Sequence, residues 1–368
     1  MKIMQIITRV NQGGTAKWLE ILTSGLMNEG YETRILCGHV QGGETEDLNF
    51  KQFNVIRISK MGRSISPLND LVSFFQIRHQ IKIHRPDVIN THTSKAGLLG
   101  RLAVISIRRN KPAVVHTYHG HLLYGYFGKN KTRALISIEN NLSKFTQMII
   151  VSGNRVKQEL LKAGVGQELQ YYLVKPGIEE LKIAERYSAR RSLGFLDDQV
   201  IVGWLGRFAE VKKPQRVIQL ASMNPDLNFV MGGSGELFDQ VSKCTLPNLK
   251  FTGWSTPEFV WGISDIGILT SDNEAQPIAL AEASMAGIPT VALNVGSIEG
   301  VIDDGETGYL VNDIGAMSER INELAKNRKL RAQMGEKAKL KMISEFNVES
   351  FIQSHVSVYK FAVKKSVG

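Results

Sequence analysis

Two carboxylates near a predicted strand end are the first residues of this 368-residue sequence that could do chemistry. Glu274 and Glu282 stand eight positions apart, with Pro277 between them, and an apolar run over residues 266–269 precedes them. Because proline suits the first turn of a helix, we expect Glu274 on a loop and Glu282 about one turn inside a helix. Both would border the carboxyl end of a strand, where open α/β sheets bind ligands. Carboxylates placed there could hold the hydroxyl groups of a ligand.

A cationic loop follows a second predicted strand. Residues 200–205 are apolar, residues 206–214 read GRFAEVKKP, and a helix is predicted over 215–222. Arg207 and Lys212 would lie at the start of that helix, where cations and free backbone N–H groups together bind anions. The two side chains could stabilise a departing diphosphate. The alternative is that they form an ordinary basic surface.

Glycine-rich or polar turns follow other predicted strands in both halves of the chain. They are NQGGT over 11–15, THTSKAG over 91–97, YHGH over 118–121, GGSG over 232–235, Gly253-Trp254 and NVGS over 294–297. This alternation of strand, loop and helix predicts parallel βαβ units with crevices along one sheet edge. No cysteine or carboxylate shares metal-ligand spacing with the loop histidines, so no metal site is expected. For His119 a structural and a catalytic role are about equally favoured.

Composition and charge indicate a water-soluble globular protein of two domains with a basic first half. Hydrophobic residues make up 43% of the chain and charged residues 22%, as in globular proteins. Residues 1–175 hold 24 Lys+Arg and 11 Asp+Glu, whereas the remainder holds 21 and 24. A first half of this charge would attract a phospholipid surface, a lipid-phosphate acceptor or nucleic acid. A solvated basic face is the plainer alternative.

Residues 122–133 combine aromatic and basic side chains, which is typical of a membrane interface. The alternative is a helix packed on the sheet with an exposed basic side. No run reaches the roughly 18 apolar residues of a membrane span, and no signal peptide is recognised. Cys37 and Cys244 lie far apart, which favours a reducing cytoplasm.

With these residues identified, the sequence resembles a retaining glycosyltransferase of family 4, one of the group 1 transferases. The matching motifs are Glu274-x7-Glu282 within NEAQPIALAEASMAG, GRFAEVKKP, GGSGEL, FTGW, DDGETGYLV, the early Gly13-Gly14 and THTSKAGLLGRLA…HTYHGH. The resemblance implies the α/β GT-B fold, with two Rossmann-like domains whose parallel sheets face a central cleft. It implies an acceptor domain over 1–175, a donor domain over 176–347, and a C-terminal helix over 348–368 that crosses back to the first domain.

The resemblance also implies roles for individual residues. Arg207 and Lys212 would hold the donor diphosphate, Glu282 the ribose hydroxyls and Glu274 the donor sugar, while His119 would line the reaction centre. Further donor-binding residues are expected at Gly13, Gly14, Gly233, Gly235, Trp254, Ala275, Gln276, Pro277 and Ile278. Acceptor-binding residues are expected at His92, Lys95, Tyr124 and Tyr126.

The sequence departs from the family pattern at a few positions. Ala275 and Lys213 stand where glycine is common, Pro176-Gly177 replaces Asn-Gly, and residues 296–300 read GSIEG in place of Gly-Gly-x-Pro-Glu. These departures affect the expected sugar specificity more than the expected reaction.

These observations predict a retaining transfer of a hexose from a nucleotide-diphosphate sugar, a UDP-sugar in particular, to a lipid-linked or saccharide acceptor of bacterial surface glycan synthesis. No Asp-x-Asp occurs, so neither metal nor cofactor is expected. The expected partners are the donor, a lipid-diphosphate-linked or saccharide acceptor, and an anionic membrane surface, but not nucleic acid. The protein would be cytoplasmic and peripheral on the inner face of the cell membrane. The alternatives are a nucleotide-sugar 2-epimerase and a basic nucleic-acid-binding protein.

Overall fold

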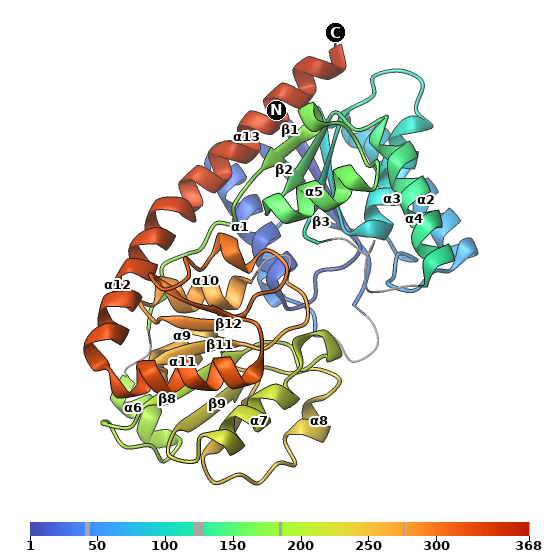
Figure 1. The fold of residues 1–368 in the computed structure, drawn as a ribbon. Helices are drawn as coiled ribbons and strands as arrows, with labels where there is room; N and C mark the ends of the chain where they lie inside the picture. The colour runs from blue at the N-terminus through green and yellow to red at the C-terminus, as the bar shows by residue number, and fades with distance from the viewer. Residues whose placement is uncertain (41–44, 121–127, 184–185, 275–276, 368) are drawn as a thin grey trace. The chain divides into compact units, whose positions relative to one another are not determined.

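The chain folds into two compact units, each built on a parallel sheet (Figure 1). The computed structural model describes residues 1–40, 45–120, 128–183, 186–274 and 277–367. Unit 1 comprises Met1–Gly177 and Val348–Gly368, and unit 2 comprises Ile178–Asn347. Two Rossmann-like α/β units confirm the predicted fold class.

Unit 1 contains a parallel sheet whose order, within the described residues, is β3-β2-β1-β4-β5-β6-β7. Its elements in chain order are β1 (Lys2–Ile7), α1 (Gly14–Asn28), β2 (Glu32–Cys37), η1 (Leu48–Gln52), β3 (Val55–Arg57), α2 (Pro67–His84), β4 (Val88–His92), α3 (Ser94–Ile105), β5 (Ala113–Tyr118), α4 (Lys129–Ser143), β6 (Met148–Val151), α5 (Asn154–Lys162), η2 (Glu168–Gln170), β7 (Tyr171–Leu173) and α13 (Val348–Val367). Helix α13 packs on α1 and β5.

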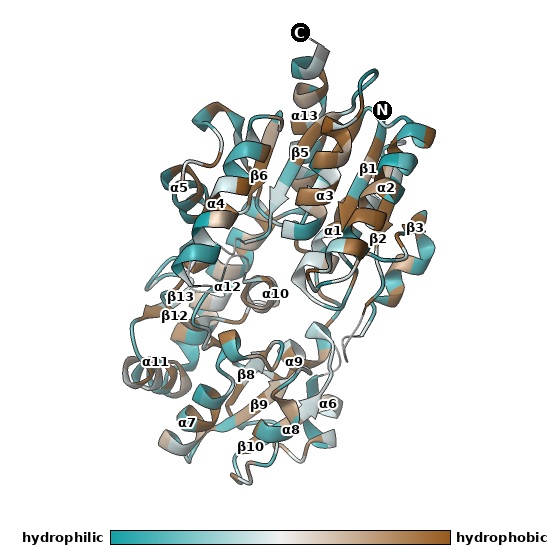
Figure 2. Ribbon diagram, turned by 90° about the vertical axis from the view of Figure 1, so that its right-hand side faces the viewer, coloured by the Kyte–Doolittle hydropathy of each residue, from teal (hydrophilic) through white to brown (hydrophobic). Residues whose placement is uncertain are grey.

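Both faces of the unit 1 sheet are buried, which explains its continuous apolar strands. Adjacent residues of a strand point to opposite faces. In β1, Ile3 packs in a cluster with Leu22 of α1, while Met4 packs in another with Ile77 of α2 and Leu99 of α3. Figure 2 shows the strands of this sheet in brown between helices that carry teal segments.

Unit 2 contains a parallel sheet of order β10-β9-β8-β11-β12-β13 within the described residues. Its elements are α6 (Arg186–Ser192), β8 (Ile201–Leu205), η3 (Glu210–Lys212), α7 (Gln215–Met223), β9 (Asn228–Gly232), α8 (Phe238–Val241), β10 (Leu249–Gly253), α9 (Pro257–Ile263), β11 (Ile266–Leu269), α10 (Ile278–Met285), β12 (Thr290–Leu293), η4 (Ile298–Gly300), β13 (Gly308–Val311), α11 (Ile314–Lys326) and α12 (Arg328–Glu345). The same alternation buries both faces: Ile201 packs with Ile263, and its neighbour Val202 packs with Val217.

Most predicted elements are present, and the differences have local causes. Helix α3 begins at Ser94, inside the stretch 91–97 that the sequence predicts as a turn, so Lys95 lies in the first turn of the helix rather than on a loop. Strand β13 and helix α9 were not predicted. Strand β13 has only four residues, and its pairing with β12 is a tertiary contact without a local sequence pattern. Among the helices of the described residues, none has the length and apolar character needed to cross a membrane.

Candidate functional site

The carboxyl edge of the unit 2 sheet has a topological switch point between β8 and β11. From β8 the chain adds β9 and β10 on one side, and then returns to place β11 on the other side. The loops after β8 and β11 therefore diverge in opposite directions and leave a crevice where ligands bind in such folds. The cationic loop over 206–214 follows β8, and the loop that carries Glu274 follows β11.

An ion pair between a partly exposed lysine and a buried glutamate joins these two loops. Lys212 Nζ donates to Glu274 Oε1 at 2.5 Å, and Ser271 Oγ donates to the same oxygen at 2.6 Å. Glu274 is 5% exposed. Thr270 Oγ1 donates to the backbone carbonyl of Lys212 at 3.0 Å, which ties the loops a second time. The pair thus holds a cation at the switch point, next to the segment that leads into α10.

Arg207 provides a second cation on the same loop. Its side chain is exposed, and within the described part of the chain its guanidinium takes part in no hydrogen bond or ion pair. An ideal Cβ at Gly235 would lie 3.0 Å from Arg207 Cγ, so the glycine turn after β9 passes directly beside this side chain. A planar guanidinium in this position suits bidentate contact with phosphate oxygens.

The glycine turn after β9 interlocks with the cationic loop. Gly233 has φ +130°, and a Cβ there would lie 1.9 Å from the carbonyl oxygen of Gly206. Phe208 N donates to Ser234 O at 2.9 Å, and Gly233 N donates to Gly253 O at 2.7 Å. The backbone segments after β8, β9 and β10 are therefore in contact with one another. Only glycine fits at position 233, because any side chain there would collide with the neighbouring backbone.

The loop after β12 supports Glu274 from the other side. Ser297 N donates to the carbonyl oxygen of Glu274 at 2.8 Å. Gly296 has φ +60°, and a Cβ there would lie 1.9 Å from that same oxygen. The segment GSIEG, which departs from the family pattern, thus retains a glycine where the backbone must approach the glutamate.

The positions predicted for Glu274 and Glu282 are confirmed. Glu274 lies on the loop after β11, and Glu282 lies one turn inside α10, where it is half-buried. Pro277 immediately precedes Ile278, the first residue of that helix. Ala275 and Gln276 lie outside the described residues.

Trp254 and Lys213 occupy the remaining positions noted in the unit 2 sequence. Trp254 follows β10 and is 58% exposed. Lys213 adopts a left-handed conformation (φ 49°, ψ 54°), which a glycine at this position would adopt without strain. Its ammonium pairs with Glu210 and lies 3.5 Å from Asp272.

Unit 1 has its own switch point, between β1 and β4. Gly13 precedes α1 with φ +151° and open space around its missing Cβ, and Gly14 is the first helical residue. Across the switch point, Thr93 has φ +65°, which is rare for a β-branched residue. Its hydroxyl is 2.6 Å from that of Thr8, a contact that links the loops after β1 and β4.

A buried chain of polar side chains leads away from this switch point. His119 Nε2 lies 2.8 Å from His92 Nδ1, and His92 Nε2 lies 2.8 Å from Gln5 Oε1. Gln5 Nε2 and Asn90 Nδ2 both donate to the hydroxyl of Tyr359, at 3.2 and 2.8 Å. These hydrogen bonds thus link the loop after β5, through side chains of β4 and β1, to α13.

These hydrogen bonds determine which nitrogen of His119 donates to His92. Burial, together with the charges of His119 and His355, lowers the pKa of His92 well below its ordinary value, so His92 is neutral. The amide oxygen of Gln5 can only accept, so His92 donates from Nε2 and accepts at Nδ1. His119 therefore donates from Nε2 to His92 Nδ1.

Two of the residues expected to bind the acceptor are engaged within unit 1. His92 is completely buried and contacts His119 and Gln5. Lys95 donates to Asp70 Oδ1 at 2.6 Å, with 12% of its side chain exposed. Tyr124 and Tyr126 lie outside the described residues.

Three residues of these sites were not found from the sequence. Ser271 lies three residues before Glu274, but no spacing rule marks it. Gln5 is a single polar residue within an apolar strand, which is a weak signal of a buried contact. Tyr359 is 354 positions away from Gln5, and no local pattern can connect residues at that separation.

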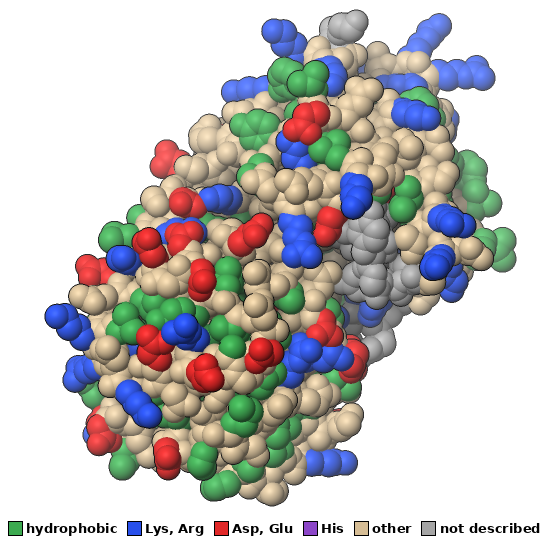
Figure 3. Space-filling view, viewed as in Figure 1, with side chains coloured by type: hydrophobic (Ala, Val, Ile, Leu, Met, Phe, Trp, Pro, Cys, Tyr) green, Lys and Arg blue, Asp and Glu red, His purple; other side chains and the backbone are tan. Residues whose placement is uncertain are grey.

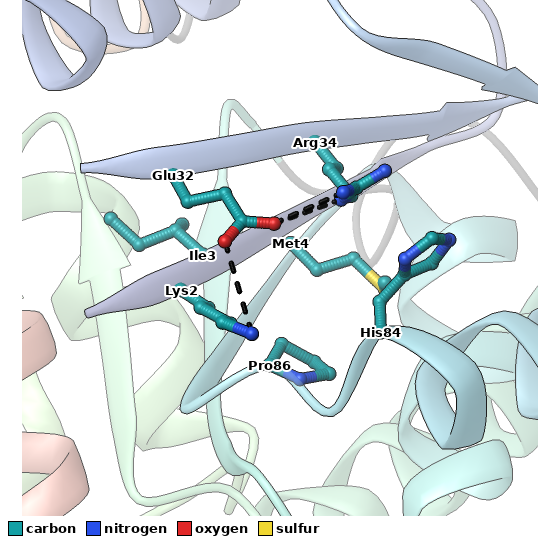
Figure 4. A pocket seen from close by; sticks show the side chains of 7 residues that line it. All are labelled: Lys2, Ile3, Met4, Glu32, Arg34, His84 and Pro86. Carbon is teal, nitrogen blue, oxygen red and sulfur yellow. Dashed lines mark hydrogen bonds and ion pairs between the residues drawn. The ribbon is translucent and has the colours of Figure 1, made fainter.

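A small pocket in unit 1 lies away from the switch point. Figure 4 shows its lining residues, which include Lys2, Glu32, Arg34 and His84. Lys2 and Glu32 are the first residues of β1 and β2, so the pocket is at the amino edge of the sheet. Glu32 pairs with both Arg34 and Lys2. Within the described residues, no three His, Cys, Asp or Glu side chains gather as a metal site would require.

Comparison with known families matches both units. A family described as "Glycosyl transferases group 1" matches residues 185–341. A second, described as "Glycosyltransferase Family 4", matches residues 12–178. The two matches follow one another along the chain and together cover most of both units. The chain belongs to the group 1 glycosyltransferases with the GT-B fold.

Individual relatives cover nearly the whole chain. A UDP-Gal:alpha-D-GlcNAc-diphosphoundecaprenol alpha-1,3-galactosyltransferase from Escherichia coli is 24% identical over 353 residues, 91% of this chain and 90% of the relative. The capsular polysaccharide biosynthesis glycosyltransferase CapM from Staphylococcus aureus is 22% identical, covering 90% and 91%. The crystal structure of Anabaena HepE in complex with UDP and glucose superposes with a TM-score of 0.81 at 17% identity, covering 98% and 99%.

Proposed function

We propose that this chain transfers a hexose from a nucleotide-diphosphate sugar, a UDP-sugar in particular, to a lipid-diphosphate-linked or saccharide acceptor in surface polysaccharide synthesis. The observation that carries the proposal is the Lys212–Glu274 pair at the β8–β11 switch point, with Arg207 exposed on the same loop. An E. coli relative named for a UDP-Gal donor and a diphosphoundecaprenol-linked acceptor supports both substrate classes.

The proposed chemistry is electrostatic. As the bond between the sugar C1 and the diphosphate oxygen breaks, negative charge develops on the leaving group. Arg207, Lys212 and the backbone N–H groups at the start of α10 would stabilise that charge. Glu274 would hold the donor sugar and keep Lys212 in position, while Glu282 would take the ribose hydroxyls. Gly233 and Gly235 would let the nucleotide approach the backbone.

We further propose that the reaction retains the anomeric configuration and needs no metal ion. The departing phosphate oxygen would accept the proton of the acceptor hydroxyl while that hydroxyl bonds to C1 on the same face. Protein cations would do the work that a metal ion does in other transferases. His119, which His92 orients, would take part in the reaction as the family resemblance implies. The acceptor would be membrane-bound, and the protein peripheral on the membrane.

A donor screen tests the proposal. Purified protein is offered uridine- and guanosine-diphosphate sugars with a lipid-diphosphate-linked saccharide, and the product's anomeric configuration is read by NMR. We expect transfer from a UDP-sugar with retention, unaffected by a chelator. Inversion would refute the front-face mechanism, and loss of activity with a chelator would refute metal independence. Conversion of the donor sugar without any acceptor would instead indicate an epimerase.

A further inference from the structure

Helix α13 presents one row of aromatic side chains to the rest of unit 1. Phe351, His355 and Tyr359 follow one another four positions apart, which places them on one helix face. Their exposed fractions are 3%, 0% and 0%. On another side of the helix Lys360 and Lys364 are exposed, and Figure 3 shows Lys and Arg side chains around the end of this helix, at the top of the view. The aromatic row therefore faces the core of the unit rather than solvent.

Tyr359 differs from a core phenylalanine by a hydroxyl group that the core must satisfy. Burial raises the pKa of this phenol above its ordinary value, so the group is neutral. Its oxygen accepts hydrogen bonds from Gln5 Nε2 at 3.2 Å and from Asn90 Nδ2 at 2.8 Å. A buried hydroxyl without such partners would cost free energy. The hydroxyl therefore joins α13 to β1 and β4, the strands that carry the two amides.

The orientation of the two amides is tied to this hydroxyl. The amide oxygen of Asn90 accepts from Thr117 Oγ1 at 2.9 Å, so the NH2 group of Asn90 faces Tyr359. The NH2 group of Gln5 also faces Tyr359, which leaves the amide oxygen of Gln5 directed at His92 Nε2. A Gln5 amide turned by half a rotation would offer its NH2 group to His92 instead. His92 would then accept at Nε2 and donate from Nδ1.

The direction of the hydrogen bond between His92 and His119 would reverse with that rotation. In the present arrangement His92 accepts at Nδ1, and His119 donates from Nε2 at 2.8 Å. In the reversed arrangement the same nitrogen of His119 would accept and could carry no proton. Because a histidine gives or takes a proton at a particular ring nitrogen, the orientation of the Gln5 amide affects what His119 can do in a reaction.

A second contact holds the ring of His119 in place. Trp18 of α1 meets this ring edge-on, with ring centroids 5.2 Å apart and an interplanar angle of 88°. Trp18 in turn packs edge-on against Phe351 and His355 of α13, with centroid distances of 4.8 and 5.6 Å. These ring contacts do not involve the hydroxyl of Tyr359. The position of the His119 ring and the direction of its hydrogen bond can therefore be separated by experiment.

We propose that Tyr359 is a positioning residue of the reaction centre. Its hydroxyl fixes the orientation of the Gln5 amide and thereby the direction of the hydrogen bond between His92 and His119. The alternative is that the hydroxyl only stabilises the packing of α13. The inference rests on the proposed function for the part that His119 plays in transfer, but the protonated nitrogen of His92 can be observed without any transfer reaction.

The test compares two variants of the full chain that each lose one buried phenolic hydroxyl. Tyr359→Phe keeps the ring in the core. Tyr171→Phe is the matched control, because Tyr171 is 8% exposed, lies in β7 of the same unit and donates to the carbonyl oxygen of Val165 at 2.5 Å. Long-range proton–nitrogen NMR spectra of the histidine-labelled chain show which ring nitrogens carry protons, and His92→Phe identifies the signals of His92. The kcat and the KM for a UDP-sugar are measured with a lipid-diphosphate-linked saccharide as acceptor.

We expect His92 of the unmodified chain to be protonated at Nε2 alone. In Tyr359→Phe a fraction of His92 should carry its proton on Nδ1, because the NH2 group of Gln5 has lost its acceptor. The kcat of this variant should fall about 10-fold, with the KM for the donor unchanged because the donor groups lie in unit 2. Tyr171→Phe should lose a similar amount of thermal stability but keep the spectrum and the kcat of the unmodified chain.

Three results would overturn the proposal: protonation of His92 at Nδ1 in the unmodified chain, an unchanged spectrum of Tyr359→Phe, or an equal loss of kcat in both variants. A changed spectrum with unchanged kcat would also overturn it, because the hydrogen-bond direction would then have no effect on transfer. A changed spectrum in a chain that transfers no sugar from any donor would refute the proposed function alone.

Discussion

The switch point of unit 2 is charged and partly open to solvent, whereas that of unit 1 is lined by neutral, buried side chains. In unit 2, Lys212 and Arg207 bring positive charge to the carboxyl edge of the sheet. In unit 1, burial keeps His92 neutral, and its ring bonds to His119 and Gln5. The same sheet arrangement therefore supports two tasks: stabilising an anion in one unit, and orienting hydrogen-bonding groups in the other.

The positive charge of unit 1 lies elsewhere, on the outer surfaces of its helices. Lys60 and Lys82 are exposed near α2, while Lys95 at the switch point is neutralised by Asp70. A reaction site needs a few charged side chains held in fixed positions. A membrane-binding surface only needs many charged side chains that are accessible to the lipid headgroups. The two units thus use cations in different ways.

The largest expected effect separates the two cations of unit 2. Lys212→Ala and Arg207→Ala should each lower kcat by about 10²-fold to 10³-fold, because the proposed mechanism uses each cation to stabilise the leaving diphosphate. Lys212→Ala should also lower the free energy of unfolding by about 1–3 kcal/mol, since Glu274 keeps a buried charge without its cation. Arg207→Ala should not.

Steady-state kinetics and thermal unfolding of both variants make the measurement. Normal turnover by folded Lys212→Ala would show that the leaving-group role is wrong. A loss of stability in Arg207→Ala would show that its side chain has a structural role.

Gly296→Ala tests how closely the backbone must support Glu274. The new Cβ would lie 1.9 Å from the carbonyl oxygen of Glu274, and the residue has φ +60°. We expect about a 10-fold to 100-fold loss of kcat, because small displacements of a positioning group cost that much. Gly300→Ala is the matched control, since no atom lies within 4 Å of its added Cβ. Equal activity of the two variants would contradict the support assigned to Gly296.

His92→Phe tests the neutral site of unit 1. The phenyl ring keeps the buried volume but breaks both hydrogen bonds, so His119 loses the partner that sets its orientation. We expect kcat to fall about 10-fold, with the KM for the donor unchanged because the donor groups lie in unit 2. If the KM for the donor rose while kcat stayed constant, the positioning role would be refuted.

The buried histidines should also make unit 1 sensitive to acid. Burial lowers the pKa of His355 from 6.5 to about 4. Between pH 6.5 and 4 the unfolded chain binds this proton and the folded chain does not, so stability falls as the pH falls. The loss should reach about 3 kcal/mol by pH 4. His355→Phe should flatten this dependence in urea unfolding followed across that range. An unchanged slope would exclude His355 as a source.

The smallest expected effect concerns Lys213. Lys213→Gly relieves a left-handed backbone (φ 49°) but removes the ion pairs with Glu210 and Asp272. These contributions oppose each other, so the midpoint of chemical denaturation should shift very little. Chemical denaturation of the two proteins measures the difference. A clear loss of stability would show that the ion pairs dominate.

Much of this protein is determined by its sequence alone. Alternating apolar strands and polar loops predict the two α/β units, because parallel sheets buried on both faces leave that pattern. The positions of Glu274 and Glu282 relative to α10 follow from Pro277. Arg207 and Lys212 could be identified because they lie on a short loop between a predicted strand and a predicted helix, where few residues are available to bind a ligand.

Other features were decided only by the tertiary structure. That Lys212 pairs with Glu274, that Gly296 packs on Glu274, and that Tyr359 connects to His119 all depend on contacts between distant segments. The outward face of α2 is another example: its sequence mixes apolar, polar and basic residues, and only the packing of Ile77 and Ile81 shows which apolar side chains remain uncovered. Local sequence sets which groups are available, and chain topology sets which of them meet.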